Sequence, residues 1–155
     1  MKPQRTINMT PIDIAAGEIG QTETPPDSNK TKYGKWFSLD GVAWCGIFVS
    51  WCYDKAGKPL GNIGFKKGFA GCQTAVAHFR KAGKIVAEPQ PSDIVFFDWN
   101  KDGRYDHTGL FVKWIDKQKG TFETIEGNTA VGNDSNGGNV MMRVRNKSVA
   151  IFVRP

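Results

Sequence analysis

Two stretches in the first half of the chain carry the apolar pattern of helices. Residues 43–56 (AWCGIFVSWCYDKA) are apolar nearly all round, which is typical of a buried central helix, and Gly57 is a stop signal. Residues 72–82 (CQTAVAHFRKA) predict another helix, ended by Gly83. Ile, Val and Trp are weak helix formers, so the helix at 43–56 must depend on packing against other elements.

The N-terminal part predicts a shorter helix followed by a loop. Residues 10–20 begin with Thr10 as a capping residue and Pro11 at the first helical position, and Gly20 is placed to end the helix. Residues 21–35 are polar and rich in turn formers, so we expect them to form a loop.

The second half of the chain changes to short runs rich in β-branched and aromatic residues, separated by turn sequences such as KDG and SNGG. Helices followed by strands predict an α+β domain, with N-terminal helices packed on a mostly antiparallel sheet. Nothing reads as a repeat or a linker, so we expect a single domain over residues 1–155. The expected strands cover residues 93–97, 107–115, 120–127, 139–146 and 148–155.

Charge narrows the classes of partner. The chain has 21 Lys and Arg against 15 Asp and Glu, a formal charge of +6. A basic surface favours polyanions, but the basic residues are scattered, which argues against nucleic acid, and an ordinary solvated surface fits equally well. No stretch is apolar and long enough to insert in a membrane. Asp13 and Glu18 follow Lys2 and Arg5, so we expect no secretory signal.

The three cysteines are an odd number, which excludes a complete disulfide framework. Cys45 and Cys52 would lie about 10 Å apart along one helix, too far for a bridge. Cys72 can meet Cys52 in space, but buried reduced thiols are the commoner state. We therefore expect a protein made in a reducing compartment.

Cys45 is the first candidate for chemistry. It stands at the start of the long predicted helix, where the positive helix end lowers a thiol pKa. The alternative is a small core residue, the commonest fate of a free cysteine. A nucleophilic cysteine needs a base. His107 opens a predicted strand with Gly109 close by, whereas His78 lies within a predicted helix, where a structural role is expected.

A third group must orient the imidazole of such a histidine. Glu126 and Asn128 stand two apart near the end of a predicted strand, so they share a face and can point into one cleft. The same sequence is also compatible with a strand that runs into a turn.

Three segments together carry a family resemblance: AWCGIFVSWCYDKAG (43–57), QPSDIVFFDWNKDGRYDHTGLFV (90–112) and IEGNT (125–129). Over residues 10–155 the chain resembles the CHAP family of cysteine, histidine-dependent amidohydrolases and peptidases. That family has a papain-like topology and is common in bacteriophage endolysins and bacterial wall hydrolases. It usually has Pro-Gly-Asp where this chain has Pro91-Ser92-Asp93, a departure at a turn.

The resemblance implies that Cys45 is the nucleophile, His107 its base and Glu126 the orienting acid, with Asn128 as an accessory polar group. His107 would take the thiol proton, the thiolate would attack an amide carbonyl, and the resulting thioester would be hydrolysed. The backbone N–H of Cys45 is a candidate oxyanion donor. Two further candidates for oxyanion or substrate contacts are Tyr33 and Trp44.

The segment before His107 follows the first nine positions of an EF-hand loop, with oxygen ligands at alternating positions around Gly103. Gly109 replaces the Glu expected at position 12 of such a loop, so the ligand set is incomplete. A polar turn between two strands is the alternative. We favour a structural Ca²⁺ near the catalytic histidine, and no organic cofactor. The predicted ligands are Asp98, Asn100, Asp102, Arg104 and Asp106.

The expected function is hydrolysis of bacterial peptidoglycan by a monomer that stays in the host bacterial cytoplasm until its release to the wall. Amidase cleavage at the muramic acid–alanine bond and endopeptidase cleavage in a stem or cross-bridge both fit. Without a separate wall-binding domain, targeting would rest on the basic charge. The alternatives are an antibacterial effector or tail-associated lysin, a catalytically silent wall-binding module, and a papain-like protease that acts on proteins.

Overall fold

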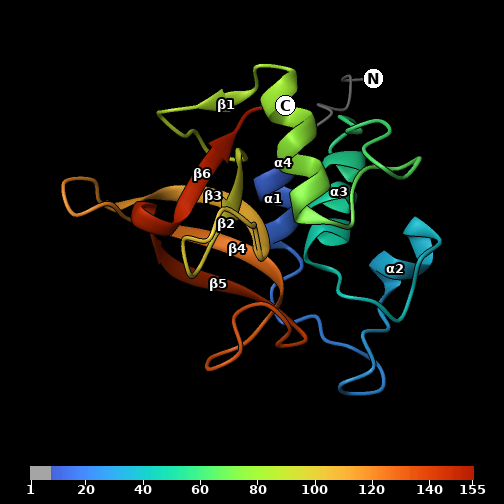
Figure 1. Ribbon diagram of the computed structural model, residues 1–155. Coiled ribbons are helices and arrows are strands. Elements are labelled where there is room, and N and C mark those ends of the chain that lie inside the picture. Colours follow the sequence, from blue (N-terminus) through green and yellow to red (C-terminus); the bar gives the residue numbers. More distant parts are fainter. Residues whose placement is uncertain (1–7) are drawn as a thin grey trace, which may run out of the picture.

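The computed structural model describes residues 8–155, and the predictions made for Lys2 and Arg5 lie outside this part. Within it, four α-helices precede a six-stranded antiparallel sheet, which confirms the α+β class (Figure 1). No helix of residues 8–155 is long and apolar enough to cross a membrane. The helices are α1 (Pro11–Ala16), α2 (Lys32–Phe37), α3 (Cys45–Lys55) and α4 (Cys72–Lys81).

The two longer helices match the sequence pattern. Most of α3 is buried, as its apolar composition predicts. By contrast, α4 buries one face, with Ala75, Val76 and Phe79 turned inward, because its remaining positions are mostly polar.

Helix α1 has the predicted start but an earlier end. The Thr10 side chain accepts the Asp13 N–H, and the Asp13 carboxylate accepts the Thr10 N–H in return. The helix ends at Ala16 rather than near Gly20, because Gly17 already closes it with its N–H bonded back to helix carbonyls. The prediction was right about the cap and too long at the other end.

The predicted loop at residues 21–35 is wrong in its last part, because α2 begins at Lys32. Thr31 caps this helix through the Gly34 N–H. Tyr33 and Phe37, one turn apart, are both buried. Two inward aromatic side chains therefore hold a single short helix within a segment that reads as polar.

The strands form one sheet in the order β1-β6-β2-β3-β4-β5, with every neighbouring pair antiparallel. The predicted runs correspond to β2 through β6, and the last is shortened by a 3-10 turn at Lys147–Val149. The two-residue strand β1, which the sequence reading missed, pairs with β6. The strands are β1 (Ile85–Val86), β2 (Ile94–Phe97), β3 (His107–Asp116), β4 (Thr121–Thr129), β5 (Asn139–Asn146) and β6 (Ala150–Val153).

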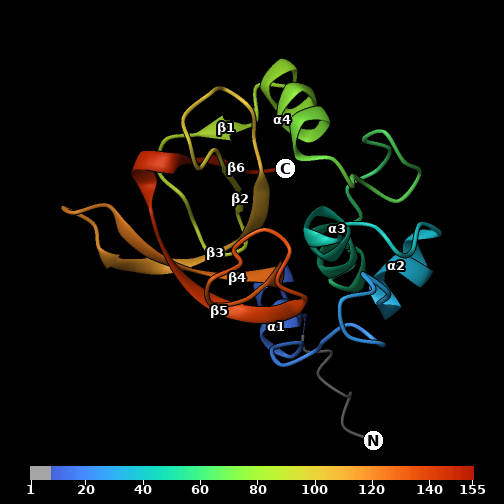
Figure 2. The ribbon, with the colours of Figure 1, turned by 60° about the horizontal axis from the view of Figure 1, so that its bottom comes forward.

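Helix α3 joins the helical side of the molecule to the sheet. It contacts β3 and β4, while α1 and α2 pack on it, and Figure 2 shows α2 and α3 together on one side of the sheet. The main core contains Ile47 and Phe48 from α3 and Leu110 and Ile125 from the sheet. A second, mostly aromatic cluster occupies the opposite face of the sheet; it consists of Val95, Phe97, Phe111, Phe122 and Phe152.

Candidate active site

Cys45 is the first residue of α3, so it lies where backbone N–H groups point out of the helix end. Trp44, the residue before it, makes no side-chain capping bond to these groups. A Cβ at Gly46 would come within 2.8 Å of the Phe69 ring and 2.9 Å of the Ala70 carbonyl. The glycine thus lets the segment that leads into α4 lie directly against the first turn of α3.

His107 is the first residue of β3 and is fully buried. Its Nε2 lies 2.9 Å from Oε1 of Glu126 on the neighbouring strand β4, and Glu126 is also fully buried. A Cβ at Gly109 would stand 2.4 Å from the Cγ of Glu126, so only glycine leaves room for this carboxylate beside β3. Nε2 is engaged and Nδ1 has no hydrogen-bond partner, so Nδ1 is the ring nitrogen available to a neighbouring thiol.

The side chains of three residues, Thr124, Arg145 and His107, hold the Glu126 carboxylate. The Thr124 hydroxyl donates to Oε2, Arg145 Nε donates to Oε2 at 2.9 Å, and Arg145 Nη2 donates to Oε1 at 2.7 Å; His107 completes the set through Oε1. Burial alone would raise the pKa of Glu126, but the hydrogen bonds from Arg145 and His107 lower it to about 2. The carboxylate is therefore ionised at neutral pH.

The pKa of the Cys45 thiol lies well below its ordinary value. The largest cause is a hydrogen bond from the thiol of Cys72, the first residue of α4. The charge on His107 and the Thr108 backbone N–H lower it further, against the opposing effect of burial. Burial would lower the pKa of His107, but Cys45 and Glu126 raise it to about 9. The thiol and imidazole thus favour a thiolate–imidazolium pair at neutral pH.

These contacts form a site with the chemistry of nucleophilic catalysis. A thiolate at a helix N-terminus, a histidine beside it and a buried carboxylate behind the histidine are the parts that covalent acyl transfer requires. The structure brings together the sequence-predicted Cys45, His107 and Glu126, which come from α3, β3 and β4. It leaves the other two cysteines unbridged and buried.

Contrary to the prediction, Asn128 does not point into the site beside Glu126. Strand β4 changes register between Glu126 and Thr129, and Asn128 has a positive φ of 59°. Its side chain donates to Asn136 Oδ1 and accepts the Gly138 N–H, so it holds the following loop. The expectation that Glu126 and Asn128 point into one cleft assumed a regular strand, and the irregularity at this point turns Asn128 elsewhere.

Tyr33 and Trp44 also have other roles than those predicted. Both are buried to 1% exposure, and their rings stack with centroids 5.5 Å apart. The Tyr33 hydroxyl donates to Glu18, and the Trp44 indole N–H donates to the buried Glu23. Both polar tips are therefore engaged inside the protein, so neither residue is placed as an oxyanion or substrate contact.

The predicted calcium loop lies between β2 and β3, directly before His107. Its carboxylates accept bonds from the loop's own backbone: Asp98 from the N–H groups of Asp102 and Gly103, and Asp106 from that of Trp99. Within residues 8–155, no group of three or more His, Cys, Asp or Glu side chains is arranged to hold a metal. The Ca²⁺ site stays a prediction, and its remaining proposed ligands are Asn100, Asp102 and the Arg104 carbonyl.

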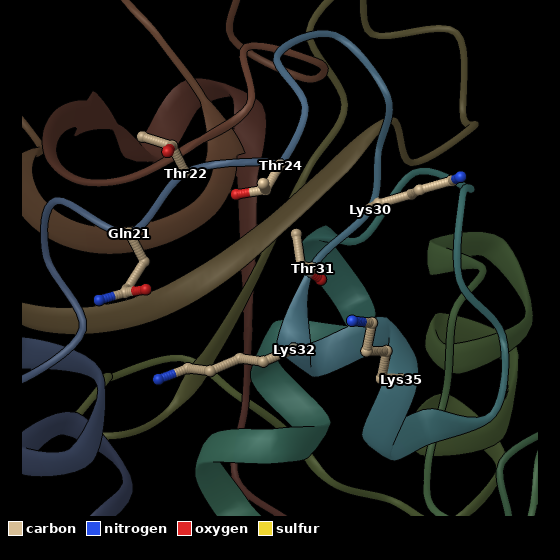
Figure 3. Close-up of a pocket in the computed structure, with 7 residues that line it drawn as sticks. All are labelled: Gln21, Thr22, Thr24, Lys30, Thr31, Lys32 and Lys35. Carbon is tan, nitrogen blue, oxygen red and sulfur yellow. The ribbon is translucent and has the colours of Figure 1, made fainter.

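A hollow of about 260 Å³ beside α2 is rich in lysine. Figure 3 shows Lys30 and Lys32 pointing in different directions from it, and Lys32 Nζ is paired with Glu18 at 2.6 Å. The lysines therefore do not converge on one ligand, and they contribute to the general basic surface. The lining residues are Gln21, Thr22, Thr24, Lys30, Thr31, Lys32 and Lys35.

Arg145 and Cys72 belong to the site, although the sequence reading missed both. Arg145 lies on β5, where the side chains of Arg143 and Arg145 turn inward and Met142 and Val144 are 44% and 59% exposed. Arginines on a strand are usually expected to face solvent, so the sequence of β5 does not predict the contact of Arg145 with Glu126. Cys72 offered one signal, because like Cys45 it begins a predicted helix.

Comparison with known proteins identifies a family and a similar fold. The model of the CHAP domain family matches residues 37–128, which include the cysteine, histidine and carboxylate of the site. No curated protein matches the chain. Among solved structures, the fold is similar to that of the crystal structure of a wild type endolysin, LysIME-EF1, with a TM-score of 0.54 and 13% identity. The match covers 95% of this chain and 65% of the endolysin chain, and at this identity it concerns the fold alone.

Proposed function

This chain belongs to the CHAP family, and on that premise we propose that it is a hydrolase of bacterial peptidoglycan that cuts an amide bond through a covalent intermediate on Cys45. The observation that supports the proposal most directly is the buried hydrogen bond of 2.9 Å between His107 Nε2 and Glu126, which leaves Nδ1 for the thiol at the start of α3. The family and the endolysin-like fold point to the wall as the substrate.

In the proposed reaction, the Cys45 thiolate attacks the amide carbonyl carbon, and a C–S bond forms as the carbonyl electron pair moves to oxygen. The Cys45 N–H at the helix end stabilises this oxyanion. The imidazolium of His107 gives its proton to the leaving amine as the C–N bond breaks, which leaves a thioester. His107 then takes a proton from water, the hydroxide attacks the thioester, and the thiolate is released.

Glu126 keeps the imidazole in one orientation during both steps. Its hydrogen bond fixes the ring so that Nδ1 remains turned toward Cys45, and its charge stabilises the imidazolium that forms with the thiolate. Because the nucleophile is a free thiol, we also propose that the protein accumulates in the reducing cytoplasm of the host bacterium and acts as a monomer after its release to the wall.

The decisive experiment is mass spectrometry of fragments released from purified peptidoglycan, with the Cys45→Ala variant as the blank. We expect wild-type protein alone to release soluble fragments. A new free L-alanine N-terminus identifies a muramoyl-alanine amidase, and a new terminus within a stem or cross-bridge identifies an endopeptidase. Binding to the wall without any released fragment would contradict the proposal and identify a silent wall-binding module.

A further inference from the structure

Arg145 makes more contacts with the candidate site than its place on an outer strand would suggest. All its guanidinium nitrogens are used: Nε and Nη2 donate to the two oxygens of Glu126, and Nη1 donates to Asp134 at 2.8 Å. Its side chain is only 8% exposed. The guanidinium carbon lies over the Trp99 ring, 4.8 Å from its centroid, so an aromatic face fixes the plane of the guanidinium group.

We propose that Arg145 is a positioning residue of the hydrolase: it holds Glu126 ionised and oriented so that the carboxylate can fix His107 toward Cys45. The proposal rests on the catalytic role given to Cys45 in the proposed function. Arg145 touches neither Cys45 nor, by any hydrogen bond in residues 8–155, His107, so its effect must pass through Glu126.

The geometry shows why Glu126 needs such a partner. The carboxylate is fully buried, and a buried charge without a counterion is unstable in its ionised form. The carboxylate must also keep one orientation, because Oε1 contacts His107 and Oε2 contacts Thr124. A bidentate guanidinium engages both oxygens at once and so fixes the carboxylate plane, whereas a lysine ammonium would supply charge from a single point.

A line of alternating charges results from this arrangement. It runs from His107 through the Glu126 carboxylate and the Arg145 guanidinium to the Asp134 carboxylate. Each charge has an opposite charge next to it. Removal of Arg145 would leave Glu126 with His107 as its one ion-pair partner among residues 8–155, and the carboxylate would be free to rotate or to take up a proton.

Arg143 offers a matched control on the same strand. Its Nη2 donates to Asp134 at 3.0 Å, and its Nη1 donates to the Thr129 hydroxyl and the Ala130 carbonyl. It therefore shares the Asp134 contact with Arg145 and makes none with Glu126. A loss that comes only from loosening the Asp134 loop should appear in both arginine variants, and a loss transmitted by Glu126 should appear in one.

The test compares Arg145→Met, Arg145→Lys and Arg143→Met in the full chain. Two rates are measured: fragment release from peptidoglycan, and alkylation of Cys45 by iodoacetamide at neutral pH, with the modified cysteine located by tandem mass spectrometry. For Arg145→Met we expect both rates to fall about 10- to 100-fold with KM unchanged. Arg145→Lys should recover part of the loss because it restores the charge, and Arg143→Met should stay close to wild type.

Equal losses in Arg143→Met and Arg145→Met, or an unchanged alkylation rate in a folded Arg145→Met variant, would overturn the proposal. If Arg145→Met does not fold, the Glu126→Gln variant is compared with the double variant Glu126→Gln/Arg145→Met. The double variant removes both charges of the pair. We expect the second change to add little to the first, since both act on one contact; additive losses would contradict the proposal. Alkylation needs no wall substrate, so a wild-type protein that releases no fragments would refute the proposed function and leave this test intact.

Discussion

The two cysteines of α3 lie about two helical turns apart and are both buried, yet their pKa values move in opposite directions. Cys45, at the first residue, has a lowered pKa because Cys72, His107 and the Thr108 N–H stabilise its thiolate. At Cys52, burial raises the pKa and the charge on Glu18 raises it further. Burial opposes ionisation at both positions, so the partners decide the outcome.

The comparison shows what separates a reactive thiol from a packing residue. A free cysteine deep in a core is protonated and inert, and this describes Cys52. The thiol of Cys45 has the helix end behind it and a cationic ring beside it. Burial on the helix therefore matters less than the partners that meet the thiol there, and for Cys45 these are first the Cys72 thiol and then His107.

The largest expected effect comes from exchanging each of these cysteines for alanine. Cys45→Ala should reduce fragment release by at least about a thousandfold, because no other group can form the thioester. Cys52→Ala should leave the rate within a few-fold and lower the stability by about 1 kcal/mol through the small cavity. Turbidity clearing and thermal unfolding of both variants provide the measurement. Similar activities for the two variants would contradict the assignment of Cys45 as the nucleophile and Cys52 as a packing residue.

The next effect separates Glu126 from Asn128. We expect Glu126→Ala to lower kcat about a hundredfold, since the His107 ring loses its hydrogen bond and its counter-charge. Asn128→Gly, which keeps the positive φ of this position, should cost about threefold or less because only the following loop loses contacts. Steady-state rates on soluble wall fragments give the ranking, and the reverse order would contradict the role assigned to Glu126.

A pH profile should show the same contrast between the thiols. The pKa of His107 is raised to about 9, so the imidazolium persists below that pH and is lost as the pH rises through it. We expect the rate of wall hydrolysis to fall on the alkaline side near pH 9, and Cys45 to react with iodoacetamide at neutral pH while Cys52 does not. Neutral-pH alkylation of Cys52 at the same rate would contradict the comparison.

The smallest expected effect concerns the loop at residues 98–106. If it binds Ca²⁺, excess chelator should lower the melting temperature by about 2–4 °C and slow Cys45 alkylation a few-fold, because the backbone before His107 loosens. The reactivity of Cys52 should not change, and added Ca²⁺ should restore both values. Identical melting curves with and without chelator would contradict the predicted Ca²⁺ site.

Residue type and order, together with the resemblance of three segments to one family, were enough to name Cys45, His107 and Glu126, which the structure brings together. An apolar helix that begins with Cys45, a histidine that opens a strand and a carboxylate one strand later each have few equivalents in the chain. The fold class followed from the same separation of helical and strand patterns. These features are local in the sequence, which is why they could be read from it.

The parts that failed depend on contacts between distant segments. Tyr33 reads as part of a polar loop, but its ring packs in the core against the aromatic rings of Trp44, Phe48 and Trp51. Asn128 follows an irregularity in β4 that no alternation rule predicts. Arg145 turns inward because it forms ion pairs with Glu126 and Asp134. The neighbouring apolar residues Met142 and Val144 are exposed as a result.

Two glycines limit how far the sequence of this chain can be varied. Gly109 leaves the space that Glu126 fills, and a Cβ at Gly127 would meet Phe48 and Trp44 at 2.7 to 2.9 Å. Neither position has an unusual φ, so the restriction is one of volume. A library that aims to change the bond cut or the host range should hold both positions fixed and place its diversity elsewhere, since alanine alone at either would displace a neighbour on which the nucleophile depends.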